Sequence, residues 1–162
     1  IINSIGGFDD PAMIAAAVET GAAVVVMHIQ GQPRVHQPAP QYVDVVAEVR
    51  AFLIERTDAL LQAGIAGDRI IIDPGPGFGK TTEHDLAVLR GLSEIALAYP
   101  LLLATSRKKF IGDVLGAEAD DRLDGSLATA AWGVLHGAKI IRTHDVRATS
   151  RVVRMIEAVE ER

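Results

Sequence analysis

Five short apolar runs rich in Val, Ile and Leu alternate with longer segments of helical spacing along the whole chain. Such runs are typical of strands that are buried on both faces, as in a parallel sheet covered by helices. The alternation therefore predicts an α/β domain built from five successive βα units. The predicted strands are Ile1–Ile5, Ala22–Ile29, Arg69–Asp73, Leu101–Thr105 and Lys139–Thr143.

The segments between the runs carry signals for the starts and ends of helices. Asp10-Pro11 places a capping residue before a proline at the first helical position, and Gly21 follows the last turn. No shift in composition marks a second domain, so residues 1–162 are expected to form a single domain. The predicted helices are residues 10–21, Tyr42–Ala63, Thr82 to about Ala98, Asp124–His136 and Ala148–Glu160.

Five parallel strands fit two architectures. An open doubly wound sheet needs no further sequence, whereas a (β/α)8 barrel needs eight strands and roughly 200 or more residues. The chain opens with Ile1-Ile2-Asn3, already inside a predicted strand, and polar residues follow several strands instead of one switch point. Both observations favour a barrel of which this chain is a part, but the pattern alone leaves both architectures open.

Polar residues with chemical potential follow three of the predicted strands. Asp73 ends one strand and precedes a glycine-rich turn, Ser106-Arg107-Lys108 follow the next, and Arg142 and His144 alternate along the end of the last. A buried carboxylate can accept two parallel N–H donors from a heterocyclic ring, and cations on one strand end suit a phosphate or diphosphate. These residues predict a pocket for an anionic ligand that also carries N–H donors.

Local alternatives exist for each of these signals. Asp73 could merely cap the following turn, and Arg142 could pair with Asp145 or another acid. The segment that ends in Gly79-Lys80-Thr81 fails as a P-loop, because that loop needs a glycine where Pro74 stands. The five histidines show no metal-binding spacing.

The bulk composition restricts the class of protein. A net charge of -5 and a pI near 5.5 argue against nucleic acid or an anionic membrane as the main partner. The chain has no cysteine, which excludes disulfides and thiolate metal sites. No apolar run approaches the ~20 residues of a membrane span, and no signal peptide opens the chain. We expect a soluble cytoplasmic protein.

Six motifs, taken in chain order, together resemble the dihydropteroate synthase family. The resemblance covers nearly the whole chain and implies a (β/α)8 barrel from about its fourth strand to its eighth, with the first three βα units outside this sequence. The motifs are Ile2-Asn3, Val26-Met27-His28-Ile29-Gln30-Gly31-Gln32-Pro33, Asp73-Pro74-Gly75 with Gly77-Phe78-Gly79-Lys80, Ser106-Arg107-Lys108, Gly125-Ser126-Leu127 and Arg142-Thr143-His144-Asp145-Val146.

The family joins a dihydropterin-methyl diphosphate to p-aminobenzoate in folate synthesis and releases diphosphate. The resemblance implies Mg2+ as cofactor, with its protein ligand in the part of the barrel outside this chain, and a homodimer formed through late helices. It implies three catalytic residues, Lys108, Arg142 and His144. It also implies a pterin pocket lined by Asn3, Met27, Asp73 and Lys108, a p-aminobenzoate contact at Lys109, and a diphosphate site at Arg142 and His144.

Four positions depart from the usual family pattern: Ser4 replaces Asp, Pro76 replaces Phe, Ala104 replaces Gly and Lys109 replaces Ser. They leave open a diverged paralogue that binds a pterin or another anion with weak or altered synthase activity. Pterin-binding methyltransferases often share the pair Asn3-Ser4, but a methyl donor without diphosphate does not require the cationic cluster. A further alternative is a purely structural fragment, whose open sheet edges would make it prone to aggregate.

Overall fold

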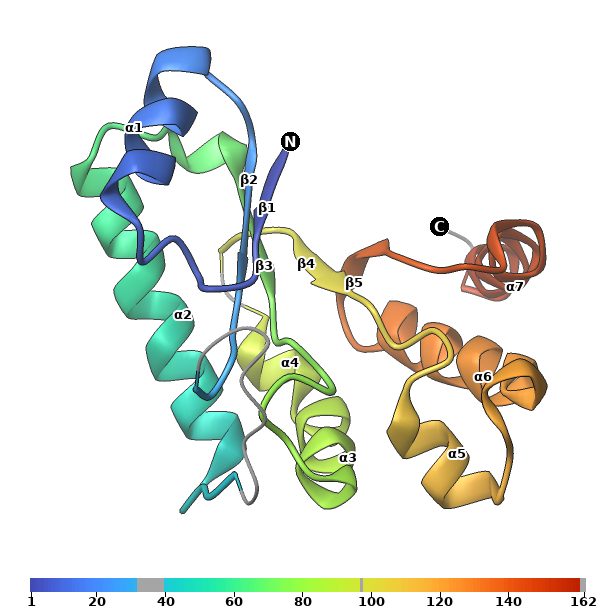
Figure 1. Cartoon of the computed structure of the whole chain (residues 1–162). Coiled ribbons are helices and arrows are strands. Elements are labelled where there is room, and N and C mark those ends of the chain that lie inside the picture. The colour runs from blue at the N-terminus through green and yellow to red at the C-terminus, as the bar shows by residue number, and fades with distance from the viewer. Residues whose placement is uncertain (32–39, 97, 161–162) are drawn as a thin grey trace.

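The computed structural model describes residues 1–31, 40–96 and 98–160. Two residues of the motifs above, Gln32 and Pro33, and one of the five histidines, His36, lie outside these ranges. Within them, five parallel strands form one sheet in the order β1-β2-β3-β4-β5 (Figure 1). The strands are β1 (Ile2–Ser4), β2 (Val24–Met27), β3 (Ile70–Asp73), β4 (Leu101–Leu103) and β5 (Ala138–Ile141). Each lies within or one residue beyond its predicted range.

Helices follow every strand and lie along the outer side of the curved sheet (Figure 1). They are α1 (Pro11–Thr20), α2 (Val45–Gln62), α3 (Thr82–Arg90), α4 (Leu92–Ile95), α5 (Lys109–Leu115), α6 (Leu123–Leu135) and α7 (Val146–Val159), with 3-10 turns at Gly67–Arg69 and Ala119–Asp121. No helix among the described residues is both long and apolar enough to cross a membrane.

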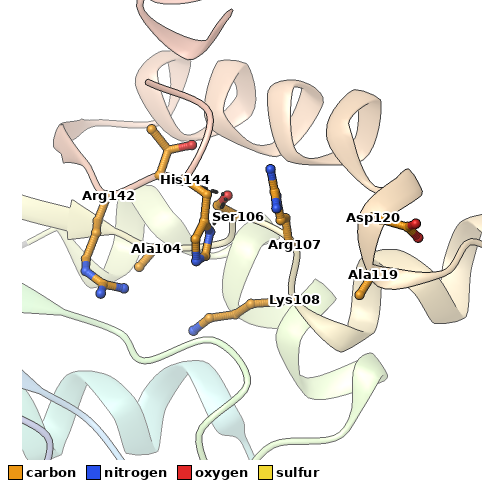
Figure 2. A pocket seen from close by; sticks show the side chains of 9 residues that line it. Ala104, Ser106, Arg107, Lys108, Ala119, Asp120, Arg142 and His144 are labelled. Atoms are coloured by element: carbon orange, nitrogen blue, oxygen red, sulfur yellow. Dashed lines mark hydrogen bonds between the residues drawn. The ribbon is translucent and has the colours of Figure 1, made fainter. Parts of the chain in front are cut away.

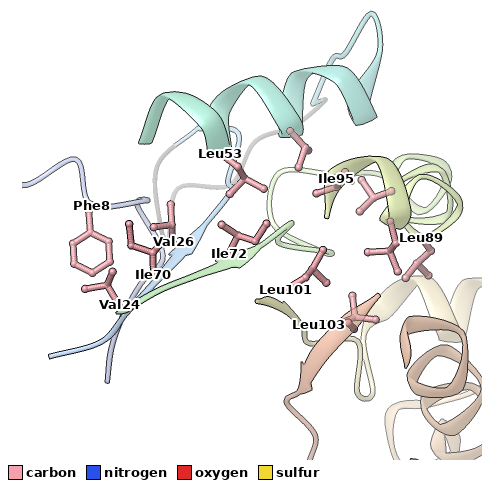
Figure 3. Close-up of a cluster of buried hydrophobic side chains, with 14 of the residues drawn as sticks. Phe8, Val24, Val26, Leu53, Ile70, Ile72, Leu89, Ile95, Leu101 and Leu103 are labelled. Carbon is pink, nitrogen blue, oxygen red and sulfur yellow. The ribbon is translucent and has the colours of Figure 1, made fainter. Parts of the chain in front are cut away.

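The main core lies between the sheet and the helices. Because side chains alternate between the two faces of a strand, every second strand residue points into this core. Ile70 and Ile72 are fully buried there in one cluster with Leu53 of α2 and Ile95 of α4 (Figure 3). The intervening residues Val25, Ile71, Leu102 and Ala104 form a separate cluster on the opposite, inner face.

The same alternation determines which polar residues face inward. Asp73 follows Ile72 on β3 and therefore lies on the inner face with Ile71. Strand register sets Met27 beside Asp73 and Asn3 beside Val25, so both also belong to the inner face. The sheet thus gathers the predicted pterin-contacting residues of three strands on one side.

The helices depart from prediction in three places. The helix predicted from Thr82 to about Ala98 is wrong in its length, because it breaks at Gly91, where the Val46 side chain packs against the backbone and glycine weakens the helix. Helix α2 begins at Val45 and not at Tyr42, because the Asp44 side chain accepts from the N–H groups of Val46 and Ala47. Helix α5 was not predicted, because its seven residues are too few to show a clear amphipathic repeat.

Candidate active site

The carboxylate of Asp73 is buried at the end of β3, with only 3% of the residue exposed. Its Oδ1 accepts a hydrogen bond from the Gly75 N–H at 2.7 Å. Burial raises the pKa of Asp73 to about 6, while the Gly75 hydrogen bond and the charges of Lys108, Lys80 and Arg142 oppose that rise. Asp73 does bond to the next turn, as a local cap would, through one of its two oxygens.

Lys108 approaches Asp73 from the end of the next strand. Its ammonium lies 4.5 Å from the centre of the Phe78 ring and donates to the carbonyl oxygen of Pro76. Burial lowers the pKa of Lys108, and the charge of Asp73 partly restores it. The lysine is therefore a cation placed between the glycine-rich loop and the strand ends.

An open cavity of about 540 Å³ lies at the ends of β4 and β5 (Figure 2). Lys108, Arg142 and His144 lie toward one side of it, and Asp120 lies at the opposite end. Arg142 and His144 therefore lie in the same cavity, as predicted, although β5 itself ends at Ile141. The lining residues are Ala104, Ser106, Arg107, Lys108, Ala119, Asp120, Arg142, Thr143 and His144.

Two contacts join the loop after β4 to the loop after β5. The Ser106 hydroxyl lies 3.0 Å from Nδ1 of His144 and also accepts from the His144 N–H at 3.2 Å. Arg107 donates from Nε and Nη2 to the two carboxylate oxygens of Asp145, at 3.0 and 2.7 Å. Asp145 thus pairs with Arg107, and the alternative in which it pairs with Arg142 is not what the structure contains.

The backbone of Arg107 is itself unusual, with a φ of 58° in the left-handed region that non-glycine residues rarely adopt. Its N–H donates to the Ser126 hydroxyl at 2.9 Å, and its carbonyl accepts from Arg122. Surrounding contacts on both sides therefore hold a strained turn, as is common at functional sites.

The remaining predicted residues are placed differently. Met27 is buried beside Asp73, but Asn3 is exposed on the edge strand β1. Lys109 does not line the cavity, because it begins α5 and its 83%-exposed side chain pairs with Asp113 one helical turn later. Among the described residues, no group of three or more His, Cys, Asp or Glu side chains could hold a metal ion.

Two site residues were missed by the sequence analysis. Asp85 on α3 is 3% exposed and accepts from the Gly77 N–H at 2.6 Å, and Lys80 donates to two carbonyls of the glycine-rich loop. The position of Lys80 directly after that loop was a usable signal. Asp85 offered none, since an acidic residue in the first turn of a helix is ordinary.

The arrangement combines two chemical capacities. A buried carboxylate with a neighbouring ammonium can recognise the edge of a polar ring through N–H donors and an acceptor. Exposed arginine and histidine side chains beside it can hold a phosphate-type anion and stabilise negative charge that grows there during a reaction. The two capacities are close enough that Arg142 influences the pKa of Asp73.

Comparisons with known proteins identify the family of this chain. The family described as "Pterin binding enzyme" matches residues 1–144. Dihydropteroate synthase of Escherichia coli (strain K12) is 45% identical over 159 residues, which are 98% of this chain and 56% of that protein. The chain therefore spans little more than half the length of such relatives.

Solved structures give the same picture. A dihydropteroate synthase from Stenotrophomonas maltophilia with imidazole in its active site superposes with a TM-score of 0.95 at 41% identity, over 98% of this chain and 61% of the other. The Xanthomonas albilineans enzyme in complex with 7,8-dihydropteroate gives a TM-score of 0.91 at 38% identity, over 98% and 58% of the two chains.

Proposed function

Because this chain belongs to the dihydropteroate synthase family of pterin-binding enzymes, we propose that it is the larger, C-terminal part of such a synthase. Its five βα units are a partial barrel of the kind that these structures share. The proposed reaction joins (7,8-dihydropterin-6-yl)methyl diphosphate to p-aminobenzoate and gives 7,8-dihydropteroate and diphosphate. The structural relative that holds 7,8-dihydropteroate supports this substrate class.

The observation that carries the proposal is the meeting of a buried carboxylate and a cationic cavity at neighbouring strand ends. Asp73 accepts N–H donors from the pterin edge, and Lys108 donates to a ring oxygen or nitrogen. Met27, buried beside Asp73, packs against the flat face of the ring. Asn3 completes the pterin pocket from β1 once the rest of the barrel is present.

Arg142 and His144 act on the leaving group in this proposal. Cleavage of the carbon–oxygen bond leaves positive charge on the pterin methylene and negative charge on the departing diphosphate. The two side chains, with Lys108 beside them, stabilise that negative charge where it develops. The amine of p-aminobenzoate then attacks the cation-like carbon and loses a proton, so no covalent enzyme intermediate forms.

We retain Mg2+ as a proposed partner of the diphosphate. Its protein ligand is proposed, from the family resemblance, to lie in the part of the barrel outside this chain. No step of the mechanism above depends on the ion.

A diverged paralogue with altered activity is the second candidate. Ala104 adds a methyl group to the cavity wall, and Lys109 is paired with Asp113 and away from the cavity. The p-aminobenzoate contact proposed for Lys109 therefore needs its side chain or backbone to reach the cavity in the complete protein. Pro76 lacks the aromatic side chain that the family usually has at this position, but its carbonyl oxygen accepts a hydrogen bond from Lys108.

The deciding experiment uses the full-length natural protein that contains this chain. Diphosphate release from dihydropterin-methyl diphosphate is measured with Mg2+, with and without p-aminobenzoate. Release that depends on p-aminobenzoate, together with dihydropteroate formation, supports the synthase. Tight pterin binding without such release favours the paralogue and directs the search to another acceptor.

We also propose that the full-length protein is a homodimer formed through its late helices. Apolar side chains that are at least two-fifths exposed lie on α6 and α7, and they would be covered in a dimer. They are Leu123, Trp132, Leu135, Val146, Met155 and Val159. A monomeric mass by light scattering at micromolar concentration would contradict this assembly.

The isolated 162 residues are proposed to be less stable than the complete barrel and largely inactive. Strands β1 and β5 form the two ends of the sheet, and each pairs with a single neighbour. Urea unfolding and turnover of the isolated chain, compared with the full-length protein, measure both properties. Cooperative unfolding at equal denaturant concentration together with normal turnover would contradict the proposal.

A further inference from the structure

Lys80 ends the glycine-rich loop and does not line the cavity, yet its ammonium makes three polar contacts. It donates to Nδ1 of His28 at 2.8 Å, to the Gly75 carbonyl at 3.0 Å and to the Phe78 carbonyl at 3.2 Å. A lysine ammonium has three N–H groups, so all of them are used. His28 belongs to the segment after β2, and the lysine therefore links that segment to both ends of the loop.

The loop lies flat against the segment after β2. Gly75 and Gly79 have φ values of 63° and 58°, and a Cβ atom at either position would collide with the carbonyl of His28 or of Gln30. Tyr42 donates to the Gly79 carbonyl at 2.7 Å, and Asp85 accepts from the Gly77 N–H. These contacts and the bonds of Lys80 together hold both ends of the loop in place.

Two loop residues connect Lys80 to the groups that the proposed reaction uses. Gly75 bonds to Lys80 through its carbonyl and to Asp73 through its N–H. Phe78 bonds to Lys80 through its carbonyl, and its ring lies under the ammonium of Lys108. Movement of the loop would therefore displace the partners of both Asp73 and Lys108.

The charges around Lys80 fit a partly buried structural cation. Burial lowers its pKa to about 7, while Asp85 and Asp73 raise it and Lys108 lowers it. Burial and the charge of Lys80 lower the pKa of His28 to about 3, so its ring is neutral and Nδ1 can accept. Both acidic neighbours, Asp73 and Asp85, are buried and would lose a compensating charge without this lysine.

We propose that Lys80, through His28 and the carbonyls of Gly75 and Phe78, is a positioning residue that fixes Asp73 and Lys108 for pterin binding. The inference rests on the proposed function, because it assumes that the ligand at Asp73 is a pterin. It assigns Lys80 no contact with substrate.

The test compares Lys80→Met with Lys139→Met in the full-length protein. Lys139 is an exposed lysine on β5 outside the proposed site, so the same chemical change there is a matched control. The probe is 6-hydroxymethylpterin, which lacks diphosphate, and its Kd is measured by calorimetry. We expect Lys80→Met to weaken binding by about tenfold or more, from the loss of charge-assisted hydrogen bonds that order the loop. Lys139→Met should stay within about twofold, as surface substitutions usually do.

Hydrogen exchange of the ligand-free proteins supplies a second readout. The amides of Gly75, Gly77 and Phe78 should exchange faster in Lys80→Met, whereas those of α7 should not change. Weaker binding with unchanged loop exchange would overturn the proposal, and so would faster exchange with unchanged binding. If the wild-type protein binds no pterin, the proposed function fails, while the exchange rates still test whether Lys80 anchors the loop.

The pH profile separates positioning from general stabilisation. A deprotonated Lys80 has two N–H groups for three acceptors, so pterin affinity should fall as pH rises through neutral. That decline should be absent from Lys80→Met, while effects of Asp73, Asp85 and Lys108 remain in both proteins and His28 stays neutral. An identical decline in both proteins would overturn the proposal. Should Lys80→Met not fold, Lys80→Gln, which retains a donor, takes its place with the same expected direction.

Discussion

The β3 side and the β5 side of the site hold their charges in different surroundings. On the β3 side, Asp73 and Asp85 are buried and their pKa values are raised by loss of solvation. On the β5 side, Arg142 and His144 are exposed and line an open cavity (Figure 2). Buried charges interact strongly but lose hydration free energy on folding. Exposed charges keep their hydration, but solvent and salt weaken their interactions.

This difference suggests a division of labour between the two sides. A neutral ring with fixed N–H donors needs a rigid, dehydrated acceptor, which the β3 side provides through Asp73. A diphosphate that must enter and leave in each cycle is better served by accessible cations. Substitutions that act on one side only can test whether the division is real.

The largest effect is expected from Asp73→Asn in the full-length protein. The amide retains the shape of the side chain but replaces one acceptor oxygen with a donor, so it opposes a ring N–H. Loss of hydrogen bonds to a charged group corresponds to roughly 3 kcal/mol, or about a hundredfold weaker binding of 6-hydroxymethylpterin. Calorimetry measures this loss. An affinity within threefold of the wild type would remove Asp73 from the pterin pocket.

The same carboxylate should make stability depend on pH. Its pKa is about 6 when folded against an ordinary value of 3.8, so the folded protein binds this proton more tightly than the unfolded chain. Stability from this group is therefore lost as pH rises from about 4 to 6, by on the order of 2 kcal/mol. The stability of Asp73→Asn relative to wild type should rise over that window in urea titrations. A constant difference from pH 4 to 6 would show that Asp73 does not titrate there.

Arg142→Ala should affect the diphosphate ligand more than the pterin alone. Removal of one charge-assisted contact at an exposed site corresponds to roughly 1.5 kcal/mol, or about tenfold. Affinities for dihydropterin-methyl diphosphate and for 6-hydroxymethylpterin are measured in parallel, and only the first should change by that amount. If Asp73→Asn and Arg142→Ala each weaken both ligands equally, the division between the two sides is wrong.

The smallest effect is expected from Ser106→Ala. This change removes the hydroxyl that contacts Nδ1 and the N–H of His144, but it leaves the Arg107–Asp145 pair intact. A neutral hydrogen bond contributes about 1 kcal/mol, so the KM for the diphosphate substrate should rise about fivefold. Steady-state kinetics measure it, with the affinity for 6-hydroxymethylpterin as the internal control. If only the affinity for 6-hydroxymethylpterin falls, Ser106 contributes to pterin binding and not to the diphosphate site.

Much of the β3 side could be predicted from sequence because it depends on local pattern. The apolar run Ile70–Ile72 predicts a strand, and the alternation of side-chain direction along a strand predicts that Asp73 points to the same face as Ile71. The pairing of Arg107 with Asp145 could not be predicted, because it depends on how two loops 38 residues apart meet in space. Helix α5 was missed for a related reason: its burial through Phe110 and Ile111 depends on tertiary contacts and not on a long amphipathic repeat.

The close approach of the glycine-rich loop to the backbone after β2 also limits how this protein can vary. Positions 75 and 79 admit no side chain without displacing the neighbouring backbone, so a mutational library spread over the loop would lose most members that alter them. Pro76 and Phe78 carry the only loop side chains other than Pro74 between Asp73 and Lys80. Changes in ligand preference are therefore expected to accumulate at these two positions, both in natural divergence and in directed evolution.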